Sequence, residues 1–428
     1  MKVAFLIDRG NLVRYLAPVI AETLRSGYQV FCLLGQISAA GDPKAHLDAT
    51  EADLPAALRT KVESFPFTGY AALERLIAQL QPDAIISTQE RGHYAKFGAD
   101  LPDSLFVTLQ VGVDTLANSG KQSVFGTSDL VCLYTPYWLD LSAEIYALSG
   151  QGKREEYGEA VAGKIAFAGA PQFDQFAKID PQEVRQRWGI PAEQPVVLVL
   201  PIPLANLSDY WSLFFMAETR AQQLKKLFWG GVHESPALFF EHFSWAWRGW
   251  NDAYLNHVLS QFSQHNGAYL LVKGRKKDPV RPSLAAVADK VLYDDENDPA
   301  TIFEALAIAD LCIHFYSTAT LEAAYAGVPA LCIHRPSPFA KYGERPPYPT
   351  RWWSSIAQGP YNFVGVNRWL SIPDAIEQLP TYALDTFKID AQARQNFLEK
   401  YVGPIDHQAS RRVLDAVEAR VAQPEVIR

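Results

Sequence analysis

Residues Ala307–Ile333 read AIADLCIHFYSTATLEAAYAGVPALCI, and this stretch decides the fold of the chain. The apolar run Asp310–His314 leads into a polar turn, Leu321–Tyr325 has the pattern of a helix start, and the apolar run Pro329–Ile333 follows a glycine-proline break. A strand, a helix and a second strand in this order predict one βαβ unit. Such a unit places its two strands parallel in one sheet.

The turn inside this stretch carries hydroxyl groups where the helix is expected to begin. Ser317, Thr318 and Thr320 stand beside backbone N–H groups that have no partner within the helix. A helix N-terminus of this kind suits an anion such as phosphate, and the acid Glu322, one turn later, can reach a ribose diol. The alternative is an ordinary βαβ unit whose Ser and Thr residues only cap the helix.

Short apolar runs alternate with helical segments along the rest of the chain. Near-continuous apolar strands between helices are typical of parallel sheets buried on both faces. The segment Gly169–Pro195 separates these runs into two halves, and we place an inter-domain linker there. We therefore expect an α/β protein of two doubly wound domains with a ligand cleft between them, at the carboxyl ends of the strands. The predicted strands are Val3–Ile7, Gln29–Leu34, Ala84–Ser87, Leu105–Leu109, Leu130–Leu133, Ile165–Phe167, Val196–Leu200, Ala268–Lys273, Lys290–Tyr293, Asp310–His314, Pro329–Ile333 and Phe363–Val366.

Composition limits the class of protein and its partners. The 428 residues exceed what one core usually organises, and a hydrophobic fraction of 48% with 20% charged residues is that of a globular chain. A net charge of −8 argues against a general nucleic-acid binder, which would carry a basic excess. No apolar stretch approaches ~18 residues, so no membrane span is expected, and the opening MKVAFLI reads as a strand rather than a signal peptide. The four cysteines stand singly in apolar runs and are expected to be buried thiols of a cytoplasmic protein.

A cluster of cations follows the predicted strand Ala268–Lys273. Lys273, Arg275, Lys276 and Lys277 stand at the carboxyl end of a strand in an otherwise acidic protein. Phosphate suits them through charge-assisted hydrogen bonds, although a solvated basic turn is the alternative. We expect this strand to neighbour the one before Ser317, so that two phosphate-suited features meet in one cleft. The predicted nucleotide and phosphate site is Lys273, Arg275, Ser317, Thr318 and Glu322.

The loop after the first strand offers candidate groups in the other half. Asp8-Arg9-Gly10-Asn11 is neither GxGxxG nor a P-loop, because the glycine spacing and the GK[ST] triplet are missing. Asp8 is a candidate general base, and Arg9 and Asn11 are candidates for holding an acceptor. The alternative is that Asp8 and Asn11 only cap the following helix.

Two further loops of the first half carry titratable residues. Gln110, Gly112 and Asp114 follow the strand Leu105–Leu109, where Asp114 could accept a proton from an acceptor hydroxyl and Gln110 could bind the acceptor. His93, after the strand Ala84–Ser87, can titrate near neutral pH. The alternatives are a helix cap for Asp114 and an ordinary surface position for His93. The candidate catalytic residues are thus Asp8, Asp114 and His93.

The segment Leu227–Leu259 is rich in Phe and Trp. Aromatic faces stack on sugars, so it could be an acceptor platform to which His233 and Glu234 contribute, or a surface that contacts lipid. Packing against the core is the alternative. No HxxEH, CxxC or paired-acid spacing is present, so no metal site is expected.

Four stretches together resemble the GT-B glycosyltransferase superfamily. ADLCIHFYSTATLEAAYAGVPALCI resembles its donor-site signature, VKGRKKDP its preceding basic element, and IAFAGAPQFDQF its entry to the inter-domain linker. FLEKYVGPIDHQASRRVLDAVEA resembles the tail of the CDP-glycerol glycerophosphotransferase and capsule-polysaccharide transferase group. UDP-sugar 2-epimerases share much of the donor signature.

The resemblance implies a fold, a domain plan and an activity. It implies a Rossmann-like acceptor domain over residues 1–185, a Rossmann-like nucleotide-sugar domain over 186–405, and a C-terminal helix over 406–428 that crosses back to the N-terminal domain. The implied activity is metal-independent sugar transfer from a nucleotide-sugar, used as a co-substrate with no cofactor, to a cell-envelope polysaccharide or glycolipid acceptor. A protein of this kind would be cytoplasmic, with peripheral membrane contact as a further expectation.

The chain departs from the family pattern where the chemistry is done. Asn11 stands where many inverting members have a catalytic His, Val111-Gly112 where the glycerophosphotransferase group has a His-Gly pair, and His314 where many retaining members have an acid. Two alternatives therefore stay open: a nucleotide-sugar 2-epimerase on the same fold, and a non-catalytic nucleotide-sugar-binding protein of an envelope assembly complex.

Overall fold

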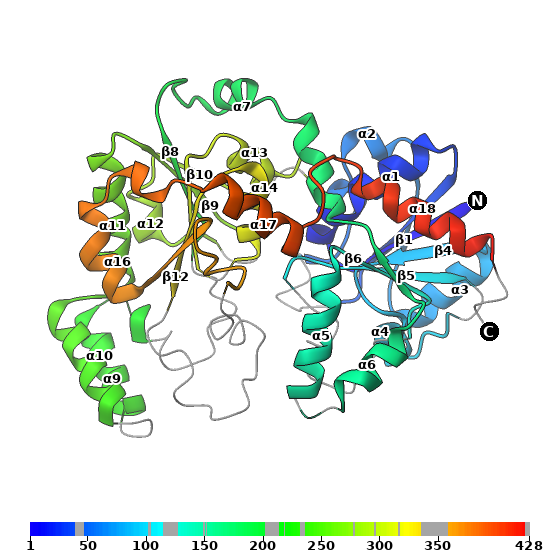
Figure 1. Ribbon diagram of the computed structural model, residues 1–428, viewed down its shortest axis with the longest axis horizontal. Coiled ribbons are helices and arrows are strands. Elements are labelled where there is room, and N and C mark those ends of the chain that lie inside the picture. Colours follow the sequence, from blue (N-terminus) through cyan, green and yellow to red (C-terminus); the bar gives the residue numbers. More distant parts are fainter. Residues whose placement is uncertain are drawn as a thin grey trace.

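The computed structural model describes residues 1–38, 47–101, 104–113, 127–148, 150, 152–201, 214–217, 219–231, 236–276, 279–294, 297–315, 317–334 and 358–423. The described strands form two parallel sheets, one in each half of the chain, and helices surround both of them. Figure 1 shows the two sheets in separate lobes that the chain joins along one side of the molecule. This is the doubly wound α/β architecture predicted from the sequence.

The N-terminal sheet has seven strands among the described residues, in the order β3-β2-β1-β4-β5-β6-β7 with every neighbouring pair parallel. Val3, Phe5 and Ile7 of β1 enter one apolar cluster, and Ala4 and Leu6 enter another. Both faces of the sheet are therefore covered, which explains the near-continuous apolar runs. The elements are β1 (Lys2–Ile7), α1 (Val13–Arg25), β2 (Gln29–Gly35), α2 (Ala56–Arg59), β3 (Glu63–Phe67), α3 (Tyr70–Leu80), β4 (Ala84–Ser87), α4 (Arg91–Ala95), β5 (Leu105–Leu109), β6 (Leu130–Leu133), α5 (Pro136–Leu148), α6 (Arg154–Val161) and β7 (Ile165–Phe167).

The C-terminal sheet has six described strands in the order β10-β9-β8-β11-β12-β13, and these are also parallel. The linker contributes the 3₁₀ helix η5 (Pro171–Lys178) and α7 (Pro181–Trp188). The elements that follow are β8 (Val196–Val199), α9 (Arg220–Gly231), α10 (Pro236–Arg248), α11 (Asp252–His265), β9 (Tyr269–Lys273), α12 (Pro282–Ala285), β10 (Lys290–Leu292), α13 (Thr301–Ala307), β11 (Leu311–His314), α14 (Ala319–Ala326), β12 (Ala330–His334), β13 (Asn367–Ser371), α16 (Ile372–Gln378), α17 (Ala391–Tyr401) and α18 (Ala409–Val421).

The predicted βαβ unit is confirmed as β11, α14 and β12, but two strand predictions nearby are wrong. Phe363–Val366 is not a strand: the Phe363 carbonyl accepts the N–H groups of Val366 and Asn367 at 3.0 and 2.9 Å, which closes a turn, and the strand begins only at Asn367. The strands β9 and β11 are not neighbours, because β8 lies between them. β3, which the apolar pattern missed, is a partly buried edge strand that contains a proline.

The last helix, α18, returns to the N-terminal half, as the resemblance implied. It packs along α1 and η5, and Figure 1 shows it beside α1. Asp174 of η5 accepts the N–H groups of Ala409 and Ser410 at 3.1 and 2.7 Å, so a linker side chain fixes the start of the helix. The domain boundary after residue 185 stays a prediction, and it falls within α7.

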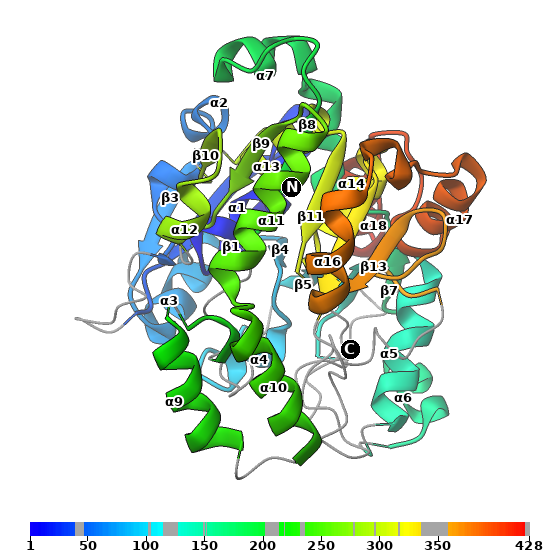
Figure 2. The same cartoon turned by 90° about the vertical axis from the view of Figure 1, so that its left-hand side faces the viewer.

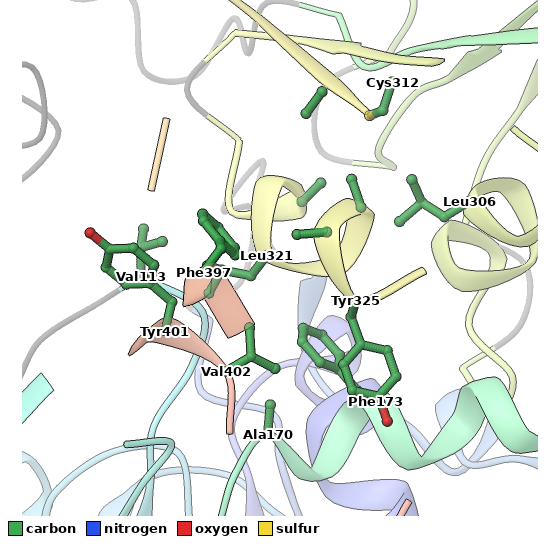
Figure 3. Packing of buried hydrophobic residues seen from close by; sticks show 14 of the residues in the cluster. Val113, Ala170, Phe173, Leu306, Cys312, Leu321, Tyr325, Phe397, Tyr401 and Val402 are labelled. Atoms are coloured by element: carbon green, nitrogen blue, oxygen red, sulfur yellow. The ribbon is translucent and has the colours of Figure 1, made fainter. Parts of the chain in front are cut away.

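An apolar cluster joins the two halves around α14. Figure 3 shows Tyr325 of α14 beside Phe173 of the linker, and the centroids of the two rings lie 4.9 Å apart. On the N-terminal side, the Trp138 indole donates to the Tyr401 carbonyl at 2.8 Å, and Trp138 is fully buried in the same cluster. The predicted βαβ unit therefore packs against side chains from both halves of the molecule. No described helix is long and apolar enough to cross a bilayer.

Candidate functional site

The buried Lys273 and the half-buried Asp294 form an ion pair at the carboxyl edge of the C-terminal sheet. Lys273 is the last residue of β9, and Asp294 follows β10, the neighbouring strand. The ammonium nitrogen lies 2.5 Å from the Asp294 carboxylate and also donates to the Gly274 carbonyl at 3.2 Å. Lys273 is only 4% exposed. Burial lowers the pKa of Lys273, and Asp294 opposes that shift.

Glu322 of α14 shares the electrostatic environment of this pair. It is 3% exposed, and burial raises the pKa of its carboxyl group. Arg14 and Lys273 counteract that rise by their positive charge, whereas Asp294 adds to it. Two cations and two acids thus influence one another in a region with little water, where charge interactions are strong.

Arg14 brings a charge from the opposite half of the molecule. It lies on α1, and its side chain donates to the Tyr15 hydroxyl at 2.6 Å. Burial disfavours the charged guanidinium, but Tyr15, Glu322 and Asp294 hold its pKa above the ordinary value. Gln175 of the linker donates to the Arg14 carbonyl at 2.7 Å and accepts the Ala300 N–H at 2.8 Å, so one buried amide ties α1 to the start of α13.

A loop of the N-terminal half touches the start of α14. Gly112 has a φ of +59°, and a Cβ placed on it would lie 2.8 Å from the Thr318 Cγ2. Only glycine fits such a contact without a shift. Gly112 donates its N–H to the Tyr134 hydroxyl at 2.9 Å, and that hydroxyl also accepts from Gln172 at 2.7 Å.

The three hydroxyl groups at the start of α14 differ in their hydrogen bonds. Thr318 is the residue before the helix, and its side chain makes no capping hydrogen bond. The Ser317 hydroxyl accepts the Ala319 N–H at 3.3 Å, whereas Thr320 is fully buried and donates to the Pro360 carbonyl at 2.8 Å. Ser317 and Thr318 are half-buried at the boundary between the halves, and Arg275 is half-buried two residues beyond Lys273.

Asp8 is a buried acid at the carboxyl end of β1. One of its carboxylate oxygens accepts from the Tyr94 hydroxyl at 2.8 Å, and the other, Oδ1, has no hydrogen-bond partner. Burial raises the pKa of Asp8 to about 6, against the effects of Tyr94 and Arg9. Neither Asp8 nor Asn11 caps α1, because its N-cap, Leu12, makes no side-chain cap bond.

Glu90 is a second buried acid that the sequence did not single out. It follows β4, the strand next to β1, and it is 7% exposed. Its Oε2 atom has no hydrogen-bond partner, and burial raises its pKa to about 8. His93, three residues later, is half-buried with its ring edge against Tyr94 and Phe97, and burial lowers its pKa.

The structure brings only part of the predicted set together. Lys273 and Glu322 both belong to the charged cluster, and Thr318 lies at the contact with Gly112 of the other half.

The other predicted residues lie elsewhere. The Gln110 amide is bonded within the protein: its nitrogen donates to the Gly112 carbonyl at 3.0 Å and its oxygen accepts the Tyr134 N–H at 2.9 Å. Arg9 and Asn11 are exposed beside Asp8. Asp114, His233 and Glu234 lie outside the described residues. Arg14, Asp294 and Glu90 are additions from the structure.

No family model and no curated protein matches this chain in sequence. Solved structures do match its fold. A variant of the wall teichoic acid polymerase TagF is 11% identical, with a TM-score of 0.57 over 99% of this chain and 89% of that one. A UDP-GlcNAc 2-epimerase from Neisseria meningitidis bound to UDP-GlcNAc is 12% identical, with a TM-score of 0.53 over 98% and 100%. S. aureus MnaA with UDP is 11% identical, with a TM-score of 0.54 over 98% and 97%. The chain has the GT-B fold that these proteins share.

The contact between Gly112 and Thr318 generates a stability prediction. Gly112→Ala is expected to lower the free energy of unfolding by about 1–3 kcal/mol, because alanine meets both the positive φ and the Thr318 methyl group. Gly98→Ala is the matched control, since Gly98 has a φ of +82° but no atom within 4 Å of the added Cβ. Urea unfolding of both variants and of Gly112→Ala/Thr318→Ala measures the difference. The cross-domain contact would be contradicted if Gly112→Ala and Gly98→Ala lowered the free energy of unfolding equally, and if adding Thr318→Ala to Gly112→Ala restored none of the loss.

Proposed function

We propose that this protein is a glycosyltransferase that moves a sugar from a nucleotide-sugar to a cell-envelope polysaccharide or glycolipid acceptor. The observation that carries the proposal is the charged cluster of the buried Lys273 and Glu322 with the half-buried Asp294 and Arg14, near the N-terminus of α14. Cations beside the positive end of the α14 dipole suit a nucleotide diphosphate or monophosphate. A fold shared with TagF and with enzymes bound to UDP or UDP-GlcNAc supports the same reading.

In this proposal the C-terminal half binds the donor. The side chains of Ser317 and Thr318 at the start of α14 hold phosphate oxygens, and Glu322 accepts hydrogen bonds from the ribose hydroxyls. Lys273 and Arg275 stabilise the negative charge that develops on the leaving phosphate as the glycosidic bond breaks. Arg14 adds positive charge from the other half, so the donor site is complete only when the two halves are together.

The N-terminal half supplies the base. Asp8 has an unpartnered carboxylate oxygen and a pKa of about 6, so near neutral pH it is largely ionised and still basic enough to take a proton from an acceptor hydroxyl. Asp114 and His93 remain further candidates for this role, and Arg9, Asn11, Gln110, His233 and Glu234 for contacts with the acceptor. The four buried thiols Cys32, Cys132, Cys312 and Cys332 support a location in the reducing cytoplasm.

A nucleotide-sugar 2-epimerase is the second candidate function. The pair of raised pKa values favours it: Asp8 and Glu90 follow neighbouring strands, and their pKa values of about 6 and about 8 suit one base and one acid. Incubation of a panel of UDP-, CDP- and GDP-sugars separates the two functions. We expect sugar transfer only when a saccharide or lipid-linked acceptor is added. Conversion of the donor to its epimer without acceptor would instead establish the epimerase.

The donor site generates a binding prediction. Glu322→Gln and Lys273→Ala should each weaken nucleotide binding by about 1–3 kcal/mol, because each removes a charged hydrogen-bonding group from a buried site. Isothermal titration calorimetry with UDP, CDP and GDP measures the loss, and Lys388→Ala, a substitution at a residue whose side chain is 78% exposed, serves as the control. Unchanged affinity in both site variants would rule out this donor site.

The raised pKa of Asp8 predicts how the free energy of unfolding changes with pH. Its folded pKa of about 6 exceeds the ordinary 3.8, so the folded state holds the proton more tightly and ionisation of Asp8 destabilises the fold above pH 6. Asp8→Asn should therefore raise the free energy of unfolding above pH 6 by about 2–3 kcal/mol, with the gain vanishing below the ordinary pKa. The same substitution should slow transfer by about 10²–10⁴-fold while donor affinity is kept.

The Tyr94 hydrogen bond provides the control for Asp8. It lowers the pKa of Asp8, so Tyr94→Phe should move the rising limb of the pH–rate profile to higher pH without abolishing transfer. Asp8→Asn activity equal to that of the unsubstituted protein, across the pH range, would exclude Asp8 as the base.

A further inference from the structure

Exposed aromatic side chains are concentrated on one part of the C-terminal half. Of the nine large apolar side chains that are exposed among the described residues, five belong to residues 228–254. They lie on α9, α10 and the start of α11, and Figure 2 shows α9 and α10 side by side, extending away from the sheet. These five side chains are Phe228, Phe240, Phe243, Trp247 and Tyr254.

The helix α10 has apolar side chains on two opposite faces. Its inner face enters the core: Trp245 and Ala246 belong to an apolar cluster of the C-terminal half, and His242 stacks on Phe214 with ring centroids 4.6 Å apart. A surface helix of a globular protein normally carries polar residues on its other face. Here that outer face carries a second set of aromatic residues instead.

Phe240, Phe243 and Trp247 form a ridge on the outer face. Their spacing of three and then four residues places them on one side of the helix. Phe240 and Trp247 are 69% and 72% exposed, and the rings of Phe243 and Trp247 stack with centroids 6.4 Å apart. Exposed apolar side chains gathered in one patch mark an interaction surface, whereas scattered ones do not.

Cations lie on the two helices next to this ridge. The helices α9 and α10 contain Arg220, Lys225, Lys226 and Arg248 against the single acid Glu241, and Arg248 pairs with Glu377 at 3.3 Å. The Arg220 guanidinium lies 5.6 Å from the centre of the Trp247 ring and donates to the Ala246 carbonyl at 2.9 Å. Lys225 on α9 is exposed.

We propose that the outer face of α10, with the cations of α9, docks this protein on an anionic bilayer surface. Phe and Trp side chains partition into the boundary between headgroups and acyl chains, and adjacent Lys and Arg side chains bind anionic headgroups. A symmetric dimer through this face suits the charges less well. In a two-fold interface the same patch meets itself, so the cations of one copy would approach those of the other.

Vesicle flotation with the full-length protein tests this inference independently of the proposed reaction. The protein is expected to float with phosphatidylcholine vesicles that contain phosphatidylglycerol, and to bind pure phosphatidylcholine vesicles more weakly. Phe240→Ser/Trp247→Ser should reduce the bound fraction by about tenfold or more, because the anchoring rings are removed. Lys225→Glu should reduce binding to the anionic vesicles only, and added salt should do the same.

Val364→Ser is the matched control, because Val364 is 72% exposed but lies outside this face. It should bind vesicles as the unsubstituted protein does, and thermal unfolding should show all variants to be folded. The inference is overturned if the unsubstituted protein stays unbound, if the double variant binds equally well, or if neutral vesicles bind as strongly as anionic ones. It is also overturned if light scattering shows a dimer that the double variant separates into monomers, because the face would then be a subunit interface.

Discussion

The burial of opposite charges where the two halves meet is the constraint on which the rest of this structure depends. Lys273 and Asp294 lie 2.5 Å apart at the ends of β9 and β10, and Glu322 and Arg14 lie within the same electrostatic environment. Lys273 and Glu322 lose hydration on burial, and the charges of the neighbouring groups offset part of that loss, together with the hydrogen bond from Lys273 to the Gly274 carbonyl. The balance holds only while α1 of one half faces α14 of the other. The aromatic cluster around Phe173 and Tyr325 and the amide of Gln175 maintain that arrangement.

The same balance determines what the proposed donor site can accept. Two cations and two acids leave the four-residue cluster without formal net charge, and a phosphate group that binds Lys273 competes with Asp294. A ligand that offers only phosphate gains little at Lys273, because the new contact replaces an existing ion pair. A nucleotide offers more, since its ribose hydroxyls donate to Glu322 while its phosphates contact the cations near the positive end of the α14 dipole. The acids therefore favour a ligand that carries hydroxyl donors beside its phosphates.

The sequence predicted the local units of this fold better than their arrangement. The unit β11-α14-β12, with Glu322 in the first turn of its helix, could be predicted from apolar periodicity, a helix start and a glycine-proline break, all of which are local. Arg14 could not, because α1 has an ordinary amphipathic pattern and only the packing of the halves brings this residue close enough for its charge to act on Glu322. The position of β8 between β9 and β11 is likewise a matter of topology. Phe363–Val366 has the composition of a strand, but the hydrogen bonds of Val366 and Asn367 to the Phe363 carbonyl close it into a turn.

The two halves differ in how they bury acids, and this difference bears on where proton transfer would occur. Asp294 pairs with Lys273 at 2.5 Å, and the charges of Arg14 and Lys273 oppose the rise that burial causes in the pKa of Glu322. Within the described residues, no cation lies within ion-pair distance of Asp8 or Glu90, and each keeps one carboxylate oxygen without a partner. An acid that is buried without a cation destabilises the fold once it ionises, so its presence at a strand end needs a reason other than stability. A proton acceptor is such a reason, because the same lack of compensation raises the pKa toward the range in which a carboxylate acts as a base.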